Sequence, residues 1–183
     1  MPFREYAPMN ITRIAATAVA VSLLTSIALS QVLTPLTSDA GFRTFIRRFE
    51  AGVNDFVNGD STLWKQNASR LEDATIMGAW GGYEKGWSEA GPRYDWAAAR
   101  FKPSGARVQI EYLASGASGD LAYTVSIERS DALVVDQRER APMALRVTHL
   151  FRKENGEWKL LHRHADPLIG KTAPGAVLQK QEP

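Results

Sequence analysis

The residues of this chain with the clearest capacity for chemistry are its three histidines, at positions 149, 162 and 164. All three lie within one stretch, LRVTHLFRKENGEWKLLHRHAD, residues 145–166. An imidazole titrates near neutral pH, so it can act as a general acid or base, bind a metal, or hydrogen-bond a ligand. If the three rings meet, His149 and His164 are the candidate catalytic acid and base, and His162 is a candidate ligand-binding residue.

The pattern leaves three interpretations open. The histidines can be hydrogen-bonded residues at the edge of a core, or they can be the polar lining of a small-ligand pocket. Alternatively, His162 and His164 on one strand and His149 on the next have the layout of a three-histidine zinc site with an open fourth position. The carboxylates that should support such a site are not evident, although Asp166 and Glu128 are available. We therefore predict no metal and no other cofactor.

The interpretation depends on a β-hairpin that positions the histidines. Side chains alternate between the two faces of a strand. A four-residue turn at 153–156 pairs Phe151 with Trp158 and His149 with Leu160. In that register all three histidines share the apolar face of the hairpin. The register is an assumption, because a shift of one residue moves every side chain to the other face.

The opposite face of the same hairpin is expected to be basic, with Arg146 facing Arg163. On the preceding strand, Tyr123 shares an apolar face with valine and isoleucine, so we expect it to reach the pocket. Glu128 lies on the other face with threonine and serine, and we expect it on the surface as a partner for Arg146.

Helices precede these strands. Residues 42–57 have apolar side chains at intervals of three and four, which predicts an amphipathic helix. Asp39 is its expected N-cap, and Asn58-Gly59 its end. A second short helix is predicted at 61–70. A third helical segment is predicted at 83–101, with a break near Gly91-Pro92.

The rest of the chain reads as β structure. A short strand is predicted within DATIMGAW, residues 73–80. Four longer strands with hairpin spacing predict an antiparallel meander; they are residues 107–115, 121–129, 143–152 and 157–165. Helices first and strands afterwards indicate an α+β fold.

Composition narrows the classes of function. The chain has 183 residues, 44% of them hydrophobic, enough for one domain with a core. Lys and Arg number 22 against 20 Asp and Glu, without a dense basic run, so we predict no nucleic-acid partner. The chain contains no cysteine, which excludes disulfides, thiolate metal sites and cysteine nucleophiles.

The N-terminus indicates export. Residues 14–30 form an uncharged run preceded by Arg13, and the run ends in Ala28-Leu29-Ser30. Its length and its Ala, Ser and Thr content favour a secretory signal peptide, residues 1–30, over an uncleaved membrane anchor. Met9 is an alternative start. We expect cleavage before Gln31, a periplasmic or secreted protein, and no stable membrane span after cleavage.

The predicted organisation is completed by a leader at 31–38, one domain at 39–168 and a flexible tail at 169–183. Several segments of that domain carry a family resemblance: DATIMGAWGGYEKGW, GDLAYTVSIER and the closing R-x-T-H, turn, G-x-W-x-x-x-H-x-H hairpin. They resemble the nuclear transport factor 2-like superfamily, in its SnoaL-like (polyketide-cyclase-like) bacterial branch. The closing hairpin is also similar to that of the calcium/calmodulin-dependent kinase II association domain, where a basic pocket residue falls at the position of His149.

The resemblance implies a cone-shaped fold, a curved antiparallel sheet wrapped around the long N-terminal helix, with a pocket at the wide end. It implies a homodimer formed through the convex face of the sheet. It also places Tyr83 and Trp87 in the segment that covers the pocket, where they are candidate ligand-binding residues with Tyr123. The superfamily contains both enzymes and non-catalytic domains, so the fold does not choose the function.

We therefore expect an exported domain that binds a small organic ligand in the cone. The alternatives are a lyase or isomerase that uses His149 and His164 as acid and base, and a non-catalytic dimerisation or assembly domain. Asp60, after the first helix, is a weaker candidate for a general base.

Overall fold

The computed structural model describes residues 39–177. The predicted signal peptide (1–30), the leader (31–38) and the last part of the predicted tail (178–183) lie outside the described residues. Within 39–177, no helix combines the length and the apolar character needed to cross a bilayer.

The first described helix, α2 (Ala40–Phe56), carries the centre of the core. The Oδ1 atom of Asp39 accepts a hydrogen bond of 2.6 Å from the backbone N–H of Phe42, which confirms the predicted N-cap. The helix ends just before Asn58-Gly59, where Gly59 has a φ of 97° that only glycine adopts readily. Its apolar side faces the sheet, with Phe42, Phe45, Ile46, Phe49 and Val53 buried.

Two further helices follow, α3 (Thr62–Asn67) and α4 (Trp87–Ala98). Helix α3 is shorter than predicted. The break expected near Gly91-Pro92 is wrong, because α4 runs through Pro92 without interruption. The carbonyl of Ser88, which lacks the N–H of Pro92 as a partner, belongs to an exposed residue, so water can take the missing hydrogen bond.

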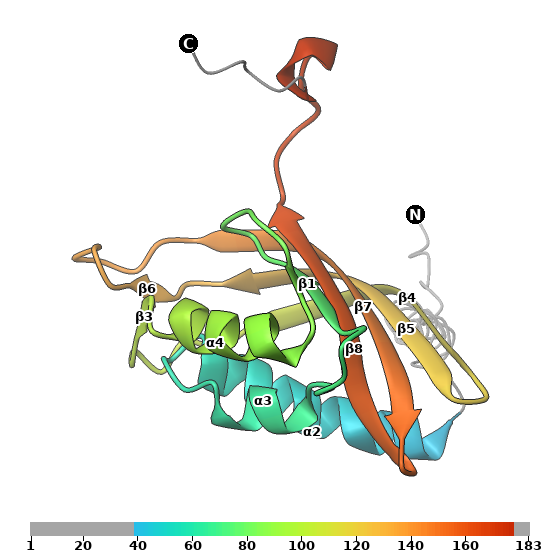
Figure 1. Ribbon diagram of the computed structural model, residues 1–183. Coiled ribbons are helices and arrows are strands. Elements are labelled where there is room, and N and C mark those ends of the chain that lie inside the picture. The colour runs from blue at the N-terminus through green and yellow to red at the C-terminus, as the bar shows by residue number, and fades with distance from the viewer. Residues whose placement is uncertain (1–38, 178–183) are drawn as a thin grey trace, which may run out of the picture. The chain divides into compact units, whose positions relative to one another are not determined.

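The predicted meander is confirmed as the larger part of a six-stranded sheet of order β2-β1-β8-β7-β5-β4 (Figure 1). Its four long strands pair antiparallel, and β1 lies parallel to β8. A separate two-stranded sheet joins β3 to β6, a short strand between β5 and β7 in the chain that the sequence did not predict. A 3-10 helix, Pro174–Val177, lies in the predicted tail. The strands are β1 (Thr75–Met77), β2 (Glu84–Lys85), β3 (Phe101–Lys102), β4 (Gln109–Ser118), β5 (Leu121–Ser130), β6 (Leu133–Val134), β7 (Met143–Glu154) and β8 (Glu157–Pro167).

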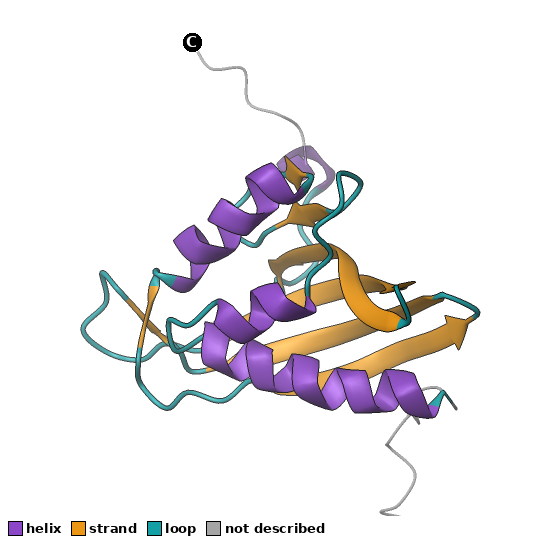
Figure 2. Cartoon of the chain, turned by 60° about the horizontal axis from the view of Figure 1, so that its bottom comes forward, coloured by secondary structure: helices purple, strands orange, loops and turns teal. Residues whose placement is uncertain are grey.

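The long strands curve over α2 and α3, which lie together on one face of the sheet (Figures 1 and 2). The core joins that inner face to the helices. Phe151 of β7, fully buried, meets the rings of Phe42, Phe45 and Phe49 at centroid distances of 5.3 to 5.4 Å. These edge-on aromatic contacts fix the helix against the middle of the sheet. The fold is therefore the α+β fold that the order of the elements predicted, with the sheet-around-helix architecture that the family resemblance implied.

The turn of the closing hairpin differs from the prediction. Glu154 pairs with Glu157, so the turn contains two residues, Asn155 and Gly156, instead of four. Both have positive φ, 52° and 83°, as a type I′ turn requires. This two-residue turn matches the right-handed twist of the strands, which explains why β7 continues past residue 152, its expected end.

A β-bulge then changes which side chains face the core. Phe151 pairs with Leu160, but the next partners are Leu150 and His162, so Leu161 is an extra residue in β8. One extra residue reverses the alternation of every side chain that follows it. The predicted regular register is therefore wrong.

The two faces of β5 are also reversed relative to the prediction. Thr124, Ser126 and Glu128 are buried on the inner face, whereas Tyr123 is 42% exposed on the outer face. Alternation shows that a strand has two different faces but does not say which one meets the core. Here the polar face turns inward because Glu128 finds a charged partner there.

Candidate functional site

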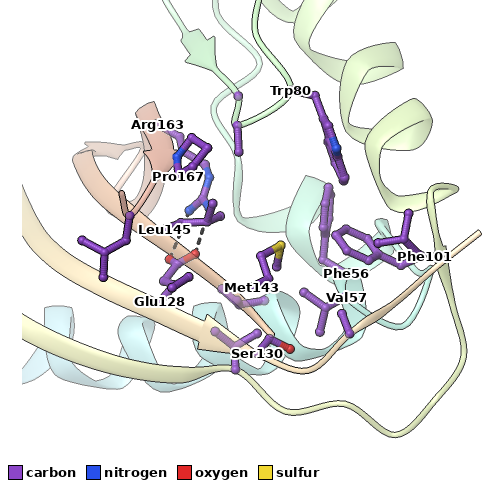
Figure 3. A pocket seen from close by; sticks show the side chains of 18 of the residues that line it. Phe56, Val57, Trp80, Phe101, Glu128, Ser130, Met143, Leu145, Arg163 and Pro167 are labelled. Atoms are coloured by element: carbon purple, nitrogen blue, oxygen red, sulfur yellow. Dashed lines mark hydrogen bonds and ion pairs between the residues drawn. The ribbon is translucent and has the colours of Figure 1, made fainter. Parts of the chain in front are cut away.

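A cavity of about 560 Å³ opens at one end of the sheet, between the end of α2, residues 78–80, Tyr94 of α4 and residues 141–145 (Figure 3). This volume is in the range of small-molecule sites. Its walls are mainly apolar; among the residues lining it are Phe56, Val57, Trp80, Phe101, Val134, Met143 and Leu145. Within the described lining, Glu128 is the one carboxylate and Arg163 the one guanidinium.

These two side chains form a buried ion pair at one end of the cavity (Figure 3). Nη2 of Arg163 lies 2.8 Å from Oε2 of Glu128, and Nη1 lies 3.1 Å from Oε1. The side chains are only 11% and 5% exposed. A bidentate pair of this kind is held strongly and nearly cancels its own charge. The polar end of the cavity is therefore close to neutral.

His149 contacts the arginine of this pair. Its Nε2 atom lies 2.6 Å from Nη1 of Arg163, and its Nδ1 atom lies 3.4 Å from the hydroxyl of Thr124. A guanidinium can only donate, so Nε2 must accept and the proton sits on Nδ1. Burial first, and then the charge of Arg163, hold the pKa of His149 well below its usual range. The ring is thus neutral, and its lone pair is already in use.

One buried polar atom of the cavity wall, the hydroxyl of Ser130, has no hydrogen-bond partner within the described residues. Tyr94 also lines the cavity, and burial raises its pKa to about 12, so it stays protonated at physiological pH. An apolar site with a few such polar groups can orient a ligand without holding a charge.

The sequence of this domain matches a known domain family. The profile of the SnoaL-like domain matches residues 60–169, more than half of the chain. The chain belongs to the SnoaL-like domain family. No curated protein sequence matches it.

Solved structures agree with the fold of this SnoaL-like domain. A nuclear transport factor 2-like superfamily protein from Salmonella enterica serovar Typhimurium is 21% identical, with a TM-score of 0.59 over 73% of this chain and 92% of that one. A candidate dehydratase of the same family from Streptomyces avermitilis is 15% identical, with a TM-score of 0.59 over 71% and 95%. A candidate calcium/calmodulin-dependent kinase II association domain from Xanthomonas campestris is 12% identical, with a TM-score of 0.57 over 74% and 93%. At these identities the likeness concerns the fold alone.

The SnoaL-like domain does not bring its three histidines together. His149 faces the core and is 3% exposed, whereas His162 and His164 lie on the outer face of β8, opposite Leu150 and Thr148 of β7. The bulge at Leu161 is the cause. The expected shared histidine face is therefore wrong, and so is the zinc layout built on it. Within residues 39–177, no three side chains of the His, Cys, Asp and Glu types are grouped to hold a metal ion.

The aromatic candidates also lie outside the cavity. Tyr83 is 75% exposed, and Tyr123 is on the outer face of β5. Trp87 is half-buried against the core, and the guanidinium of Arg70 stacks on its ring at 4.9 Å. None of the three belongs to the described cavity lining. Trp80, by contrast, is half-exposed and lines the cavity.

Two charged residues, Asp60 and Arg146, have other contacts than the sequence predicted. Asp60 lies just before α3, where its Oδ1 accepts a 2.8 Å hydrogen bond from the N–H of Thr62. The side-chain hydrogen bond with Thr62, and then this backbone hydrogen bond, lower the pKa of Asp60. Arg146 was expected to face Arg163, but it pairs with Asp166 across the hairpin on the outer face. Arg163 instead takes the inward position that His162 and His164 were expected to hold.

The sequence contained one signal for this outcome. Leu160 and Leu161 are adjacent apolar residues in a strand that otherwise alternates. Two such neighbours indicate either a strand buried on both faces or a bulge. A bulge at this position moves Arg163 inward, and a buried arginine then requires a carboxylate, for which Glu128 on the next-but-one strand is available.

Proposed function

We propose that this SnoaL-like domain binds an uncharged, largely apolar small organic molecule in the cavity between α2, α4 and β7. The observation that carries the proposal is the combination of apolar walls with a single, internally neutralised ion pair, Arg163–Glu128. An anionic ligand gains little from a guanidinium that a carboxylate already holds, and it must lose its hydration to enter. A neutral ligand avoids this cost.

The unpaired hydroxyl of Ser130 refines the expected chemistry. A buried polar atom without a partner costs free energy, roughly 1–3 kcal/mol. A ligand with a carbonyl or ether oxygen can satisfy such a donor. We therefore expect neutral ketones, esters or ethers to bind more tightly than hydrocarbons of the same shape.

Catalysis is not part of the proposal. The lone pair of His149 accepts from Arg163, and His164 lies on the other face of the sheet, so the two cannot serve one substrate as acid and base. The carboxylate of Glu128 is bonded through both oxygens to Arg163. The candidate dehydratase from Streptomyces avermitilis shares the fold, but nothing in this cavity favours that reaction.

The test is thermal unfolding of the full chain with matched pairs of neutral and carboxylate-bearing aromatic and aliphatic compounds. A ligand at a hundred times its dissociation constant adds about 2.7 kcal/mol, a shift of several degrees. We expect shifts only from the neutral members. Met143→Trp, which fills the cavity, should abolish them, whereas Leu113→Trp on the outer face should not. Equal shifts from carboxylates, or shifts that survive Met143→Trp, would contradict the proposal.

We further propose that the domain forms a homodimer through the outer face of the sheet. That face exposes large apolar side chains of neighbouring strands, namely Leu113, Leu121, Tyr123 and Leu150. Exposed apolar patches of this kind mark protein contacts. Gly116 helps to build the patch, because a Cβ at this position would lie 2.7 Å from the ring of Tyr123, which packs over it.

Export remains a proposal that rests on residues 1–30, which lie outside the described residues. The apolar run after Arg13, ending in Ala28-Leu29-Ser30, supports cleavage before Gln31 and a periplasmic or secreted mature protein. N-terminal sequencing of the protein recovered from the periplasmic fraction should begin at Gln31. Recovery with an intact N-terminus from the membrane fraction would favour the uncleaved anchor instead.

A further inference from the structure

The outer face of β8 and β1 gathers three side chains that the cavity does not use. His162 and His164 project from this face of β8, two residues apart. Met77 of β1 pairs directly with His164, and Thr75 pairs directly with His162. Paired residues of neighbouring strands share a face. Two imidazoles and one thioether therefore lie side by side on the surface.

The hydrogen bonds of the two rings leave one nitrogen of each ring available. Nδ1 of His162 lies 2.8 Å from the hydroxyl of Thr75, and Nε2 of His164 lies 3.1 Å from Oδ2 of Asp166. When these nitrogens carry the protons, Nε2 of His162 and Nδ1 of His164 keep free lone pairs. Histidines that bind metals commonly donate the other ring N–H to an oxygen in this manner.

The rings are close enough for a shared ion. Their centroids are 6.5 Å apart. Two imidazoles on one metal, each nitrogen about 2 Å from it, need centres somewhat closer. Rotation of the two side chains, which are not enclosed by the core, supplies the difference.

We propose that His162 and His164 bind one copper ion on the outer face of the sheet, with the thioether of Met77 as a further ligand for Cu(I). Copper is the metal that fits, because divalent copper has the highest affinity of the first-row ions for nitrogen ligands, and thioethers select Cu(I). Zinc favours three or four strong protein ligands, and no such group of His, Cys, Asp and Glu exists in residues 39–177.

One charge opposes the site and provides a test of its position. Arg146 lies 3.7 Å from Asp166, the carboxylate that also contacts His164. A cation so close weakens the binding of another cation. Arg146→Gln should therefore tighten copper binding a few-fold, an effect not expected of copper bound elsewhere on the chain.

The experiment is a competition titration of the untagged full chain with Cu(II) against glycine, combined with electron paramagnetic resonance. We expect one Cu(II) per chain with two nitrogen ligands. His162→Gln and His164→Gln should each weaken binding at least about tenfold. Met77→Leu should leave the Cu(II) affinity unchanged but weaken Cu(I) binding, measured against a chromogenic Cu(I) chelator. Glu111→Gln, which removes an exposed carboxylate of β4, is the control.

The proposal is overturned if glycine removes all copper, or if neither histidine variant changes the affinity while circular dichroism shows a native fold. The site shares the outer face with the proposed dimer contact but does not depend on it. Leu121→Ser should break the dimer without touching the ligands. Copper binding that disappears in the monomeric Leu121→Ser variant would also overturn the proposal of a site within one chain.

Discussion

At the scale of the residue, four side chains determine the character of the cavity. Glu128 neutralises Arg163, His149 accepts the remaining hydrogen bond of Nη1, and Thr124 lies next to His149. Each is buried on the inner face of the sheet and has a polar partner there. The arrangement orients a guanidinium towards an apolar cavity without leaving a net charge. His149 is thus a positioning residue for Arg163.

The first prediction concerns the pH dependence of stability. His149 is neutral in the folded state, with a pKa well below its usual range, but titrates near 6.5 when unfolded. Below about pH 6.5 the unfolded state therefore binds more protons, and stability is lost as the pH falls towards the folded pKa. The slope per proton is about 1.4 kcal/mol per pH unit.

The measurement is urea unfolding of wild type and His149→Gln between pH 5 and 8. The glutamine oxygen can still accept from Arg163, so the variant should fold. Its stability should fall less steeply in acid, retaining the smaller part due to His162, whose pKa is also lowered. Identical slopes in both proteins would show that His149 is not the buried neutral group.

The second prediction concerns the ion pair. Glu128→Gln leaves the charge of Arg163 buried without a carboxylate, so unfolding free energy should fall by about 3–5 kcal/mol. The double variant Glu128→Leu, Arg163→Met removes both charges and should cost clearly less. Chemical denaturation at pH 7 tests this. A double variant at least as unstable as Glu128→Gln would contradict the account of the pair.

At the scale of the element, the hairpin of β7 and β8 sorts the side chains. The Asn155-Gly156 turn determines which residues of the two strands pair first. Half-way along β8, the extra residue Leu161 exchanges the positions that face the core and the positions that face outward. Before the bulge, Trp158 and Leu160 pack into the core; after it, Arg163 faces inward and the two histidines face outward. One irregular residue thus separates the cavity from the histidine surface.

The third prediction tests the turn. Gly156 has a φ of 83°, and a Cβ there would meet nothing within 4 Å. Gly156→Ala should therefore destabilise the fold by about 1 kcal/mol through backbone strain alone. Gly170→Ala also meets open space but has no positive φ, so it should change stability by less than about 0.5 kcal/mol. Thermal unfolding of both variants makes the comparison; equal effects would rule out strain at the turn.

At the scale of the whole described domain, the sheet separates two environments. The inner face and the helices enclose the cavity, and the outer face carries an apolar patch and the histidine pair. The two faces share a backbone but no side chains, so ligand binding inside and association outside can be changed independently. The proposals for the cavity and for the outer face are accordingly tested with different variants.

The fourth prediction concerns association. If the outer apolar patch forms the homodimer, Tyr123→Ser should shift sedimentation from dimer to monomer, because it removes an exposed ring at the centre of the patch. Ligand-induced stabilisation through the cavity should persist in that variant. Met143→Trp should show the converse, a dimer without ligand response. A wild-type chain that sediments as a monomer at micromolar concentration would contradict the dimer.

The sequence by itself determined the type and order of the main helices and strands, but it missed the short strands β2, β3 and β6. The amphipathic helix with its Asp39 cap, the short strand at Thr75–Met77 and the four-strand meander follow from local periodicity and turn residues, and the structure confirms them. Local patterns suffice here because an amphipathic face or a turn depends on residues a few positions apart.

Only the tertiary structure decided which faces meet the core. Alternation in β5 separates Tyr123 from Glu128 but carries no information about the inner side. In β8, a single extra residue moves every later side chain to the opposite face of the sheet. A register based on regular alternation therefore placed His162 and His164 on the inner face, which Arg163 occupies in the structure. The pairing of distant strands and the burial of a charge beside its partner depend on the packing of the whole domain. This packing places Arg163, Glu128 and Ser130 in the cavity wall.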